Sequence, residues 1–111
     1  MVTAETAVVL PVLLLVLAGA VAAVTLVGAQ LRCVDAAREG ARTAARGEPV
    51  AAVTALIDRA APAGAVTTVV QVGEEVRVTV SARIAPLGPV PLRIPVSAEA
   101  VALREPDGGT G

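Results

Sequence analysis

The sequence of 111 residues contains no Phe, Tyr, Trp, His or Lys, and it has a single Cys. Without aromatic side chains, any folded part must build its core from Val, Leu, Ile and Ala. Without His and a second Cys, the chain lacks the ligands of a His- or Cys-liganded metal centre, the base of a histidine triad and a dithiol redox pair. We therefore expect no enzyme activity and no catalytic, cofactor-binding or metal-binding residues.

Charge is also scarce. The formal net charge is −1, and the nine basic residues are all Arg and are scattered along the chain, which argues against a nucleic-acid partner. Hydrophobic residues make up 55% of the sequence, and the mean hydropathy is +0.76. This composition is too apolar for an ordinary soluble domain of this size, and it predicts a membrane segment.

Residues 6–29 form an uncharged stretch of 24 residues. About 20 apolar residues are needed to cross a hydrocarbon core of about 30 Å. A cleaved secretory signal would have a basic start and an apolar core of roughly 7–15 residues. We therefore expect residues 1–29 to form a hydrophobic helix that stays in the protein, contacts membrane lipid and crosses the membrane once.

Helical spacing continues beyond this segment, over residues 30–47. Three basic residues four apart lie on one stripe with two acidic residues, a pattern typical of a solvated helix face. Gly47 and Pro49 should end this extension. Apolar residues recur at steps of three and four, namely Leu31, Val34, Ala37, Ala41 and Ala45.

A second helix is predicted over residues 50–61, where one face is apolar and could pack on a sheet. Pro62 and Gly64 should close it. The residues of its apolar face are Val53, Leu56, Ile57 and Ala60.

From residue 65 onward the pattern alternates. In residues 76–84 the even positions are apolar and the odd ones polar, which predicts a strand with one buried face. Residues 66–72 are rich in β-branched side chains and should pair with it as a hairpin through Gly73, Glu74 and Glu75. A proline-rich loop precedes a third strand at residues 94–103. In the middle strand we expect Val76, Val78, Val80 and Ile84 to be buried and Arg77, Thr79 and Arg83 to face solvent.

The predicted fold is therefore α+β. A long N-terminal transmembrane helix extends out of the membrane, and a short helix packs on a small three-stranded antiparallel sheet. We expect the folded module to cover residues 48–105 and residues 106–111 to be a disordered tail.

Glu5 is an acidic residue at the head of the apolar helix. It could simply start the helix, with Thr3 as N-cap, because a carboxylate near the positive end of the dipole stabilises it by about 0.3–1 kcal/mol. Alternatively, it must find a partner within a bundle of such helices, since a charge at bilayer depth costs at least about 2.5–3.5 kcal/mol.

Two motifs carry a resemblance to a known family. Glu5 stands six residues before Pro11 in an apolar run, and this region resembles the start of TadE-like pseudopilins of the tight-adherence (Flp) type IV pilus system. Residues 35–42, Asp-Ala-Ala-Arg-Glu-Gly-Ala-Arg, are similar to the helical segment that these proteins carry just outside the membrane. A strand-rich end closing in Arg104 and Glu105 is similar too.

This resemblance implies a pilin-like fold and a non-catalytic role as a minor pseudopilin in pilus assembly or secretion. Other pilin and pseudopilin subunits, the pilus assembly platform and a prepilin peptidase would be its partners. In such proteins a glutamate at the fifth position of the mature chain pairs with the N-terminal amine of a neighbour, which implies assembly roles for Met1 and Glu5, with Pro11 nearby. The peptidase would remove a leader ending in Gly, and in-frame codons upstream of Met1 would reveal such a leader.

Four residues are candidates for assembly or for contacts between subunits. Pro11 removes a backbone N–H and should loosen or kink the helix near its head. Gly19 and Ala23 form a four-residue pair that allows close approach of a second helix. Cys33 is either a small apolar helix residue or a thiol that links two subunits, since a solitary Cys cannot form an internal disulfide.

The distribution of charge and the family resemblance disagree on which side of the membrane the module lies. Four Arg follow the apolar segment and none precedes it, so the positive-inside tendency favours a cytoplasmic module. The family resemblance instead implies an extracytoplasmic module on a protein of the cytoplasmic membrane, associated with the pilus. A rival function is a single-pass membrane-anchored envelope domain that binds a ligand through its β module, with Glu5 acting only as a helix start.

Overall fold

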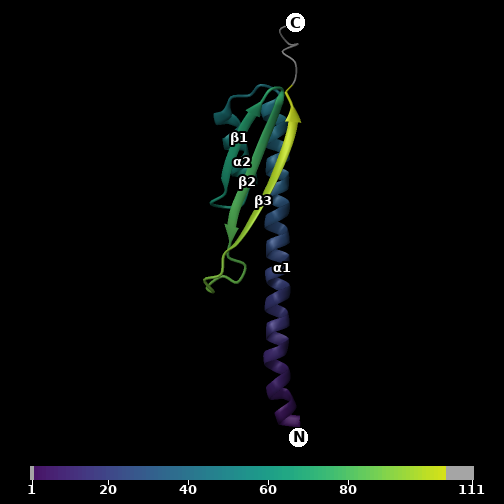
Figure 1. Ribbon diagram of the computed structural model, residues 1–111. Helices are drawn as coiled ribbons and strands as arrows, with labels where there is room; N and C mark the ends of the chain where they lie inside the picture. The colour runs from purple at the N-terminus through teal and green to yellow at the C-terminus, as the bar shows by residue number, and fades with distance from the viewer. Residues whose placement is uncertain (1, 105–111) are drawn as a thin grey trace.

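The computed structural model describes residues 2–104, and it confirms the predicted α+β fold. Helix α1 (Val2–Ala45) is followed by α2 (Val50–Ala60) and by strands β1 (Val66–Val72), β2 (Glu75–Ile84) and β3 (Ile94–Leu103). Figure 1 shows α1 as a long rod whose C-terminal half carries the other elements, while its N-terminal half projects away from them. The tail expected at residues 106–111 lies outside the described residues.

The three strands form one antiparallel sheet in the order β1-β2-β3. Val72 pairs with Glu75, so the hairpin turn consists of Gly73 and Glu74 and is one residue shorter than predicted. Gly73 has a φ of 59°, which a two-residue hairpin turn favours and which glycine adopts at little cost. Glu75 therefore belongs to the strand.

The predicted register of β2 is confirmed at most of its positions. Val76, Val78 and Val80 are buried, with exposed fractions of 3% or less, and Arg77 is exposed. Ile84 is only half-buried, contrary to prediction, because it is the last residue of the strand and lies at the end of the core. Buried Ala82 takes the preceding inward position, Arg83 is exposed, and Thr79 is half-buried on the outer face.

The face of α1 that packs against the rest of the chain is lined by small side chains. Ala37, Ala41 and Ala45 of the predicted helical extension lie on this face, whereas Leu31 is 57% exposed and Val34 is only half-buried. Small residues let the sheet and α2 approach the helix closely, which suits a chain without aromatic side chains. The buried residues of this face include Cys33, Ala36, Ala37, Gly40, Ala41 and Ala45.

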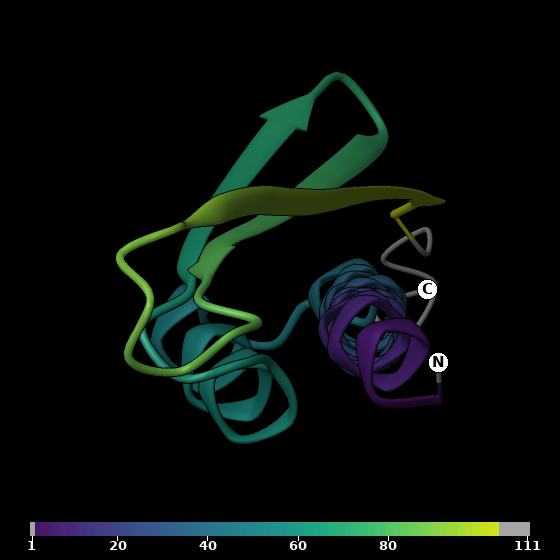
Figure 2. The ribbon, with the colours of Figure 1, turned by 90° about the horizontal axis from the view of Figure 1, so that it is seen from below.

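Helix α2 lies beside α1, and the sheet covers both helices (Figure 2). Its predicted apolar face is confirmed: Val53 and Ile57 are fully buried, and Leu56 and Ala60 are half-buried. It packs chiefly against α1 and makes fewer contacts with β1. The core of the module thus joins both helices to β2, with Val53, Ile57, Val78, Val80 and Cys33 as its largest fully buried side chains.

Gly40 marks the closest approach of α1 to α2. A Cβ at this position would lie 2.7 Å from Ile57 Cγ1 and closer still to Ile57 Cδ1. Ile57 is fully buried, so it cannot move aside into solvent. A side chain at residue 40 would therefore force Ile57 or one of the two helices to shift.

We expect Gly40→Ala to lower the free energy of unfolding. Overpacking typically costs about 1–3 kcal/mol, which exceeds the gain of about 1 kcal/mol that alanine brings to a helix. Thermal unfolding of the full chain in detergent, followed by far-UV circular dichroism, would measure the change. Gly28→Ala is the matched control, because a Cβ there meets nothing within 4 Å. Adding Ile57→Val, which removes Cδ1, should restore part of the loss; equal stability of the two alanine variants would contradict the packing.

Candidate assembly helix

The N-terminal half of α1 is a long apolar surface that nothing else in residues 2–104 covers. An 18-residue window of this helix has a mean hydropathy of 2.8, and none of that window is buried within the described structure. By length and composition the helix can cross a membrane. Such a surface needs lipid or other apolar helices around it, because its side chains would otherwise stand in water. Large exposed residues include Leu13, Leu14, Leu15, Val16 and Leu17.

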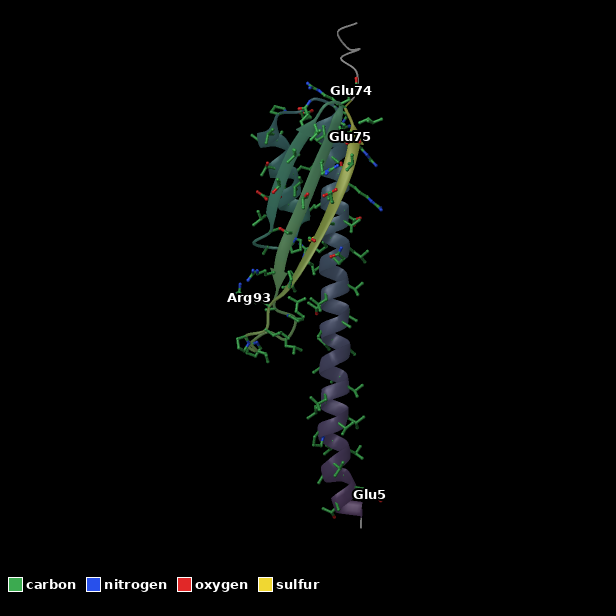
Figure 3. The ribbon with its side chains drawn as sticks, viewed as in Figure 1. Glu5, Glu74, Glu75 and Arg93 are labelled. Carbon is green, nitrogen blue, oxygen red and sulfur yellow. The ribbon has the colours of Figure 1, made fainter. Side chains whose placement is uncertain are left out.

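Glu5 lies in the first turn of α1, at the far end of this apolar surface (Figure 3). Its carboxylate is exposed and lies near the positive end of the helix dipole. Thr3 lies inside α1, so the interpretation of Thr3 as the N-cap is wrong. Met1, the other residue implied in assembly at this end, lies outside the described residues.

The other predicted packing residues lie along the same uncovered helix. Helix α1 continues without interruption through Pro11. Gly19 and Ala23 are exposed, and a Cβ at Gly19 would meet nothing within 4 Å in the described chain. The small-residue pair therefore makes no close contact within the described residues, and its surface is open to a second helix.

Cys33 has an exposed fraction of 0% and packs in the core of the module, beyond the apolar stretch of α1. Burial raises the pKa of its thiol, and the positive charge of neighbouring Arg32 partly opposes this rise. The structure thus places Cys33 as a small apolar core residue. A disulfide to a second subunit would need this thiol at the surface.

The arginine stripe on the extension of α1 faces solvent: Arg38, Arg42 and Arg46 are all exposed. Arg42 Nη1 lies 4.0 Å from Glu39 Oε2. Because both side chains are largely exposed, this ion pair contributes little to stability. Among residues 2–104 no group of three or more His, Cys, Asp or Glu could hold a metal ion.

Two hydrogen bonds near the base of the module were not predicted from the sequence. Arg32 Nη2 donates to the carbonyl of Ala61 at 3.2 Å, and Gln30 Nε2 donates to the carbonyl of Ser97 at 2.7 Å. The first places a cation at the C-terminal end of α2, where the helix dipole favours it. Together these bonds hold α2 and β3 on α1, and no local pattern in the sequence signals them.

Comparison with known proteins identifies the family of this helix. A family model described as TadE-like protein matches residues 1–42, which include Glu5, Pro11 and the extension as far as Arg42. A protein of Mycobacterium tuberculosis (strain ATCC 25618 / H37Rv) named "Apoptosis inhibitor Rv3655c" is 41% identical over 102 residues, covering 92% of this chain and 78% of the relative. The chain belongs to the TadE-like family. This confirms the resemblance seen in the sequence.

Membership in the TadE-like family links the chain to tight-adherence pilus systems, and the family is one of pilus components rather than enzymes. Helix α1, the one helix within residues 2–104 that is long and apolar enough to cross a membrane, agrees with a membrane anchor in such a system. No solved structure matches the chain.

Proposed function

We propose that the chain is a minor pseudopilin that takes part in assembly or secretion of a tight-adherence (Flp) type IV pilus, without catalysis. The observation that carries this proposal is the N-terminal half of α1, an apolar helix with Glu5 at its head that no other part of the described chain covers. An anchor alone needs only lipid around it. When helices from several subunits pack together, a carboxylate at the head of the span can neutralise a positive charge of a neighbouring subunit.

In this proposal Glu5 neutralises the N-terminal amine of a neighbouring subunit inside a bundle of apolar helices. The open surface around Gly19 and Ala23 lets a second helix approach closely. Pro11 leaves one backbone acceptor of the helix without its usual N–H, which permits local adjustment during packing. The partners are other pilin and pseudopilin subunits and the pilus assembly platform, together with a prepilin peptidase if a leader precedes Met1.

We further propose that residues 1–29 form the membrane and assembly helix, residues 30–47 its extension and residues 48–105 the folded module. The module would lie outside the cytoplasmic membrane. Its small core agrees with a component of a larger assembly, because domains of this size are marginally stable alone.

A cysteine-labelling experiment tests the side of the membrane. We expect Thr68→Cys, which places a thiol at an exposed position of β1, to react with a membrane-impermeant maleimide in intact cells. The wild-type chain is the matched control and should stay unlabelled, because Cys33 is fully buried. For an opening free energy of about 3 kcal/mol, Cys33 should react roughly 100-fold more slowly than an exposed thiol. Labelling of Thr68→Cys only after lysis would place the module in the cytoplasm.

The name of the mycobacterial relative gives a second candidate, inhibition of apoptosis, favoured by the 41% identity over most of the chain. Such an activity would depend on the exposed surface of the module rather than on the apolar helix. A variant at Glu5 should therefore leave it intact. The rival function, an anchored ligand-binding domain, should also be unaffected by a variant at Glu5. Variants at Glu5 therefore distinguish the pseudopilin from both alternatives.

A further inference from the structure

The loop between β2 and β3, residues 85–93, lies at the end of the module nearest the apolar helix. A surface hollow is lined by Val24, Gly28 and Ala29 of α1 together with Ile84 and Ala85 at the start of this loop. The loop therefore begins beside the last turns of the uncharged stretch at residues 6–29. Figure 1 shows that it then extends further toward the N-terminal end of α1.

This position brings the loop to the membrane boundary if residues 6–29 cross the bilayer. At 1.5 Å per residue a helix of 24 residues is about 36 Å long, against a hydrocarbon core of about 30 Å. The last turns of the stretch then lie at the boundary between hydrocarbon and headgroups. A loop that starts beside these turns and points toward the N-terminus must meet the same boundary.

The side chains of the loop suit an apolar environment. Eight of its nine residues are uncharged, and Arg93 is the exception. Val90 and Leu92 are large apolar residues that remain 46% and 45% exposed in the described chain. The turn between β1 and β2, at the opposite end of the module, instead carries Glu74 beside Glu75 (Figure 3).

The backbone of the loop is also largely satisfied without water. Three of its nine residues have no N–H because they are prolines, namely Pro86, Pro89 and Pro91. Three more N–H groups donate within the loop: Gly88 to Ala85, Val90 to Leu87 and Leu92 to Val90, at 3.4, 3.3 and 2.7 Å. Unsatisfied N–H groups are what makes irregular backbone costly at membrane depth, so this loop is suited to that depth.

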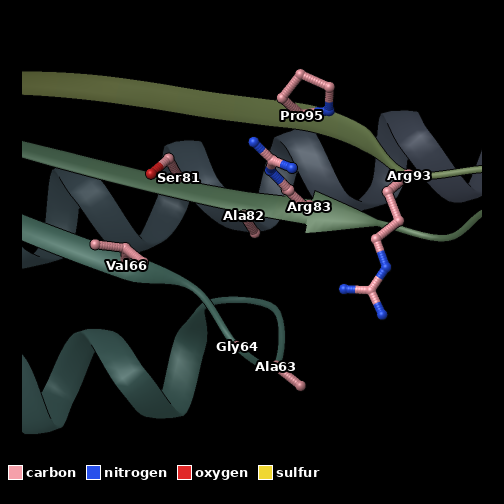
Figure 4. Close-up of a pocket in the computed structure, with 8 residues that line it drawn as sticks. All are labelled: Ala63, Gly64, Val66, Ser81, Ala82, Arg83, Arg93 and Pro95. Carbon is pink, nitrogen blue, oxygen red and sulfur yellow. The ribbon is translucent and has the colours of Figure 1, made fainter.

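Three arginines lie at the base of the loop. Arg83 is near the end of β2 and Arg93 is the last residue of the loop, and both lie above the turn formed by Ala63 and Gly64 (Figure 4). Arg32 lines the hollow at the base of the loop and donates to the carbonyl of Ala61. The salt bridges within residues 2–104 are Arg42–Glu39 and Arg77–Glu99, and neither engages these three arginines.

We propose that the β2–β3 loop docks on the bilayer that α1 crosses, with Val90 and Leu92 in the outer edge of the hydrocarbon and Arg83 and Arg93 on the phosphates of anionic lipids. This proposal rests on the membrane crossing of residues 6–29 within the proposed function. Arginine suits the role because its planar fork binds phosphate in two places and its long stem reaches the headgroups from an apolar site. Two attachments, the helix and the loop, would fix the orientation of the module on the membrane.

The absence of aromatic residues makes a background-free test available. Single-Trp variants of the full chain are reconstituted in vesicles of phosphatidylglycerol and brominated phosphatidylcholine: Leu92→Trp in the loop, Leu15→Trp in the apolar helix and Leu103→Trp at the opposite end of the module. We expect lipid bromines to quench the fluorescence of both Leu92→Trp and Leu15→Trp. The fluorescence of Leu103→Trp should not be quenched by them. Aqueous acrylamide should quench Leu92→Trp at least about threefold less than Leu103→Trp, as expected for a side chain in the interface.

The arginines are tested in the same vesicles. Adding Arg83→Gln and Arg93→Gln should lower the bromine quenching of Leu92→Trp toward its value in vesicles without phosphatidylglycerol. Far-UV circular dichroism of each variant confirms that the sheet is kept.

The loop proposal is overturned while the membrane crossing stands if Leu15→Trp is quenched by lipid and Leu92→Trp behaves like Leu103→Trp. Protection of Leu92→Trp from both quenchers would mean that a second copy covers the loop, which also overturns it. Failure of lipid to quench Leu15→Trp would overturn the crossing and the loop proposal together.

Discussion

Replacing Glu5 with Gln is expected to abolish pilus assembly while leaving the amount of the protein in the membrane unchanged. Removing a charge does not hinder insertion of an apolar span of 24 residues. If Glu5 pairs with the N-terminal amine of a neighbour, the substitution leaves that amine without its countercharge in an apolar bundle. Breaking such a buried pair costs about 3–5 kcal/mol, enough to prevent stable packing of the subunits.

Piliation by electron microscopy and membrane levels by immunoblotting measure the two effects separately. Glu48→Gln is a matched control, because it makes the same chemical change at an exposed residue between α1 and α2. If Glu5 only started the helix, its substitution would cost at most about 1 kcal/mol, and piliation would survive. Wild-type piliation and adherence of the Glu5→Gln strain would favour the anchored binding domain.

Val80→Asp is expected to unfold the module and to cause loss of the protein from the cell. Val80 is fully buried in the middle strand, among core residues that contain no basic side chain. A carboxylate there has no partner, and burying it costs several kcal/mol, which is comparable to the whole stability of a module of this size.

Ser81→Asp is the matched control for this variant. Ser81 is the next residue on the outer face, where it pairs with Val66 and Ser97. Thr79 would be a poorer choice, because it lies directly opposite Glu99 on β3 and a new carboxylate there would meet a like charge. We expect Ser81→Asp to keep wild-type levels by immunoblotting. Equal levels of the two aspartate variants would contradict the register.

The elements that the sequence predicted well are those with strong local patterns. The alternation in residues 76–84 defines one buried face, because a slip of one residue would move every side chain to the other face. Gly47 and Pro49 mark the end of α1, which the structure places at Ala45. Glycine and proline act through their own backbone geometry, so their effect is visible without knowledge of the rest of the fold.

What the sequence could not reveal depends on contacts between distant residues. Leu31 continues the helical spacing of Ala37 and Ala41, yet it is exposed, because the module covers a neighbouring stripe of α1. The need for glycine at position 40 arises only once Ile57 packs on it. The bond from Arg32 to Ala61 joins residues 29 positions apart, and composition gives no hint of it. At the assembly helix, by contrast, Glu5, Pro11 and the apolar run are contiguous and visible in the sequence alone.

Photo-cross-linking from the apolar helix in living cells tests most directly whether this helix packs against other pilus subunits. A photoreactive amino acid at Leu15, which is 73% exposed in the described structure, is activated with and without Glu5→Gln. We predict an adduct that mass spectrometry identifies as a pilin or pseudopilin subunit and that is lost in the Glu5→Gln background. Equal adducts in both backgrounds, or no protein adduct in cells that still assemble pili, would contradict the role of Glu5 in subunit packing.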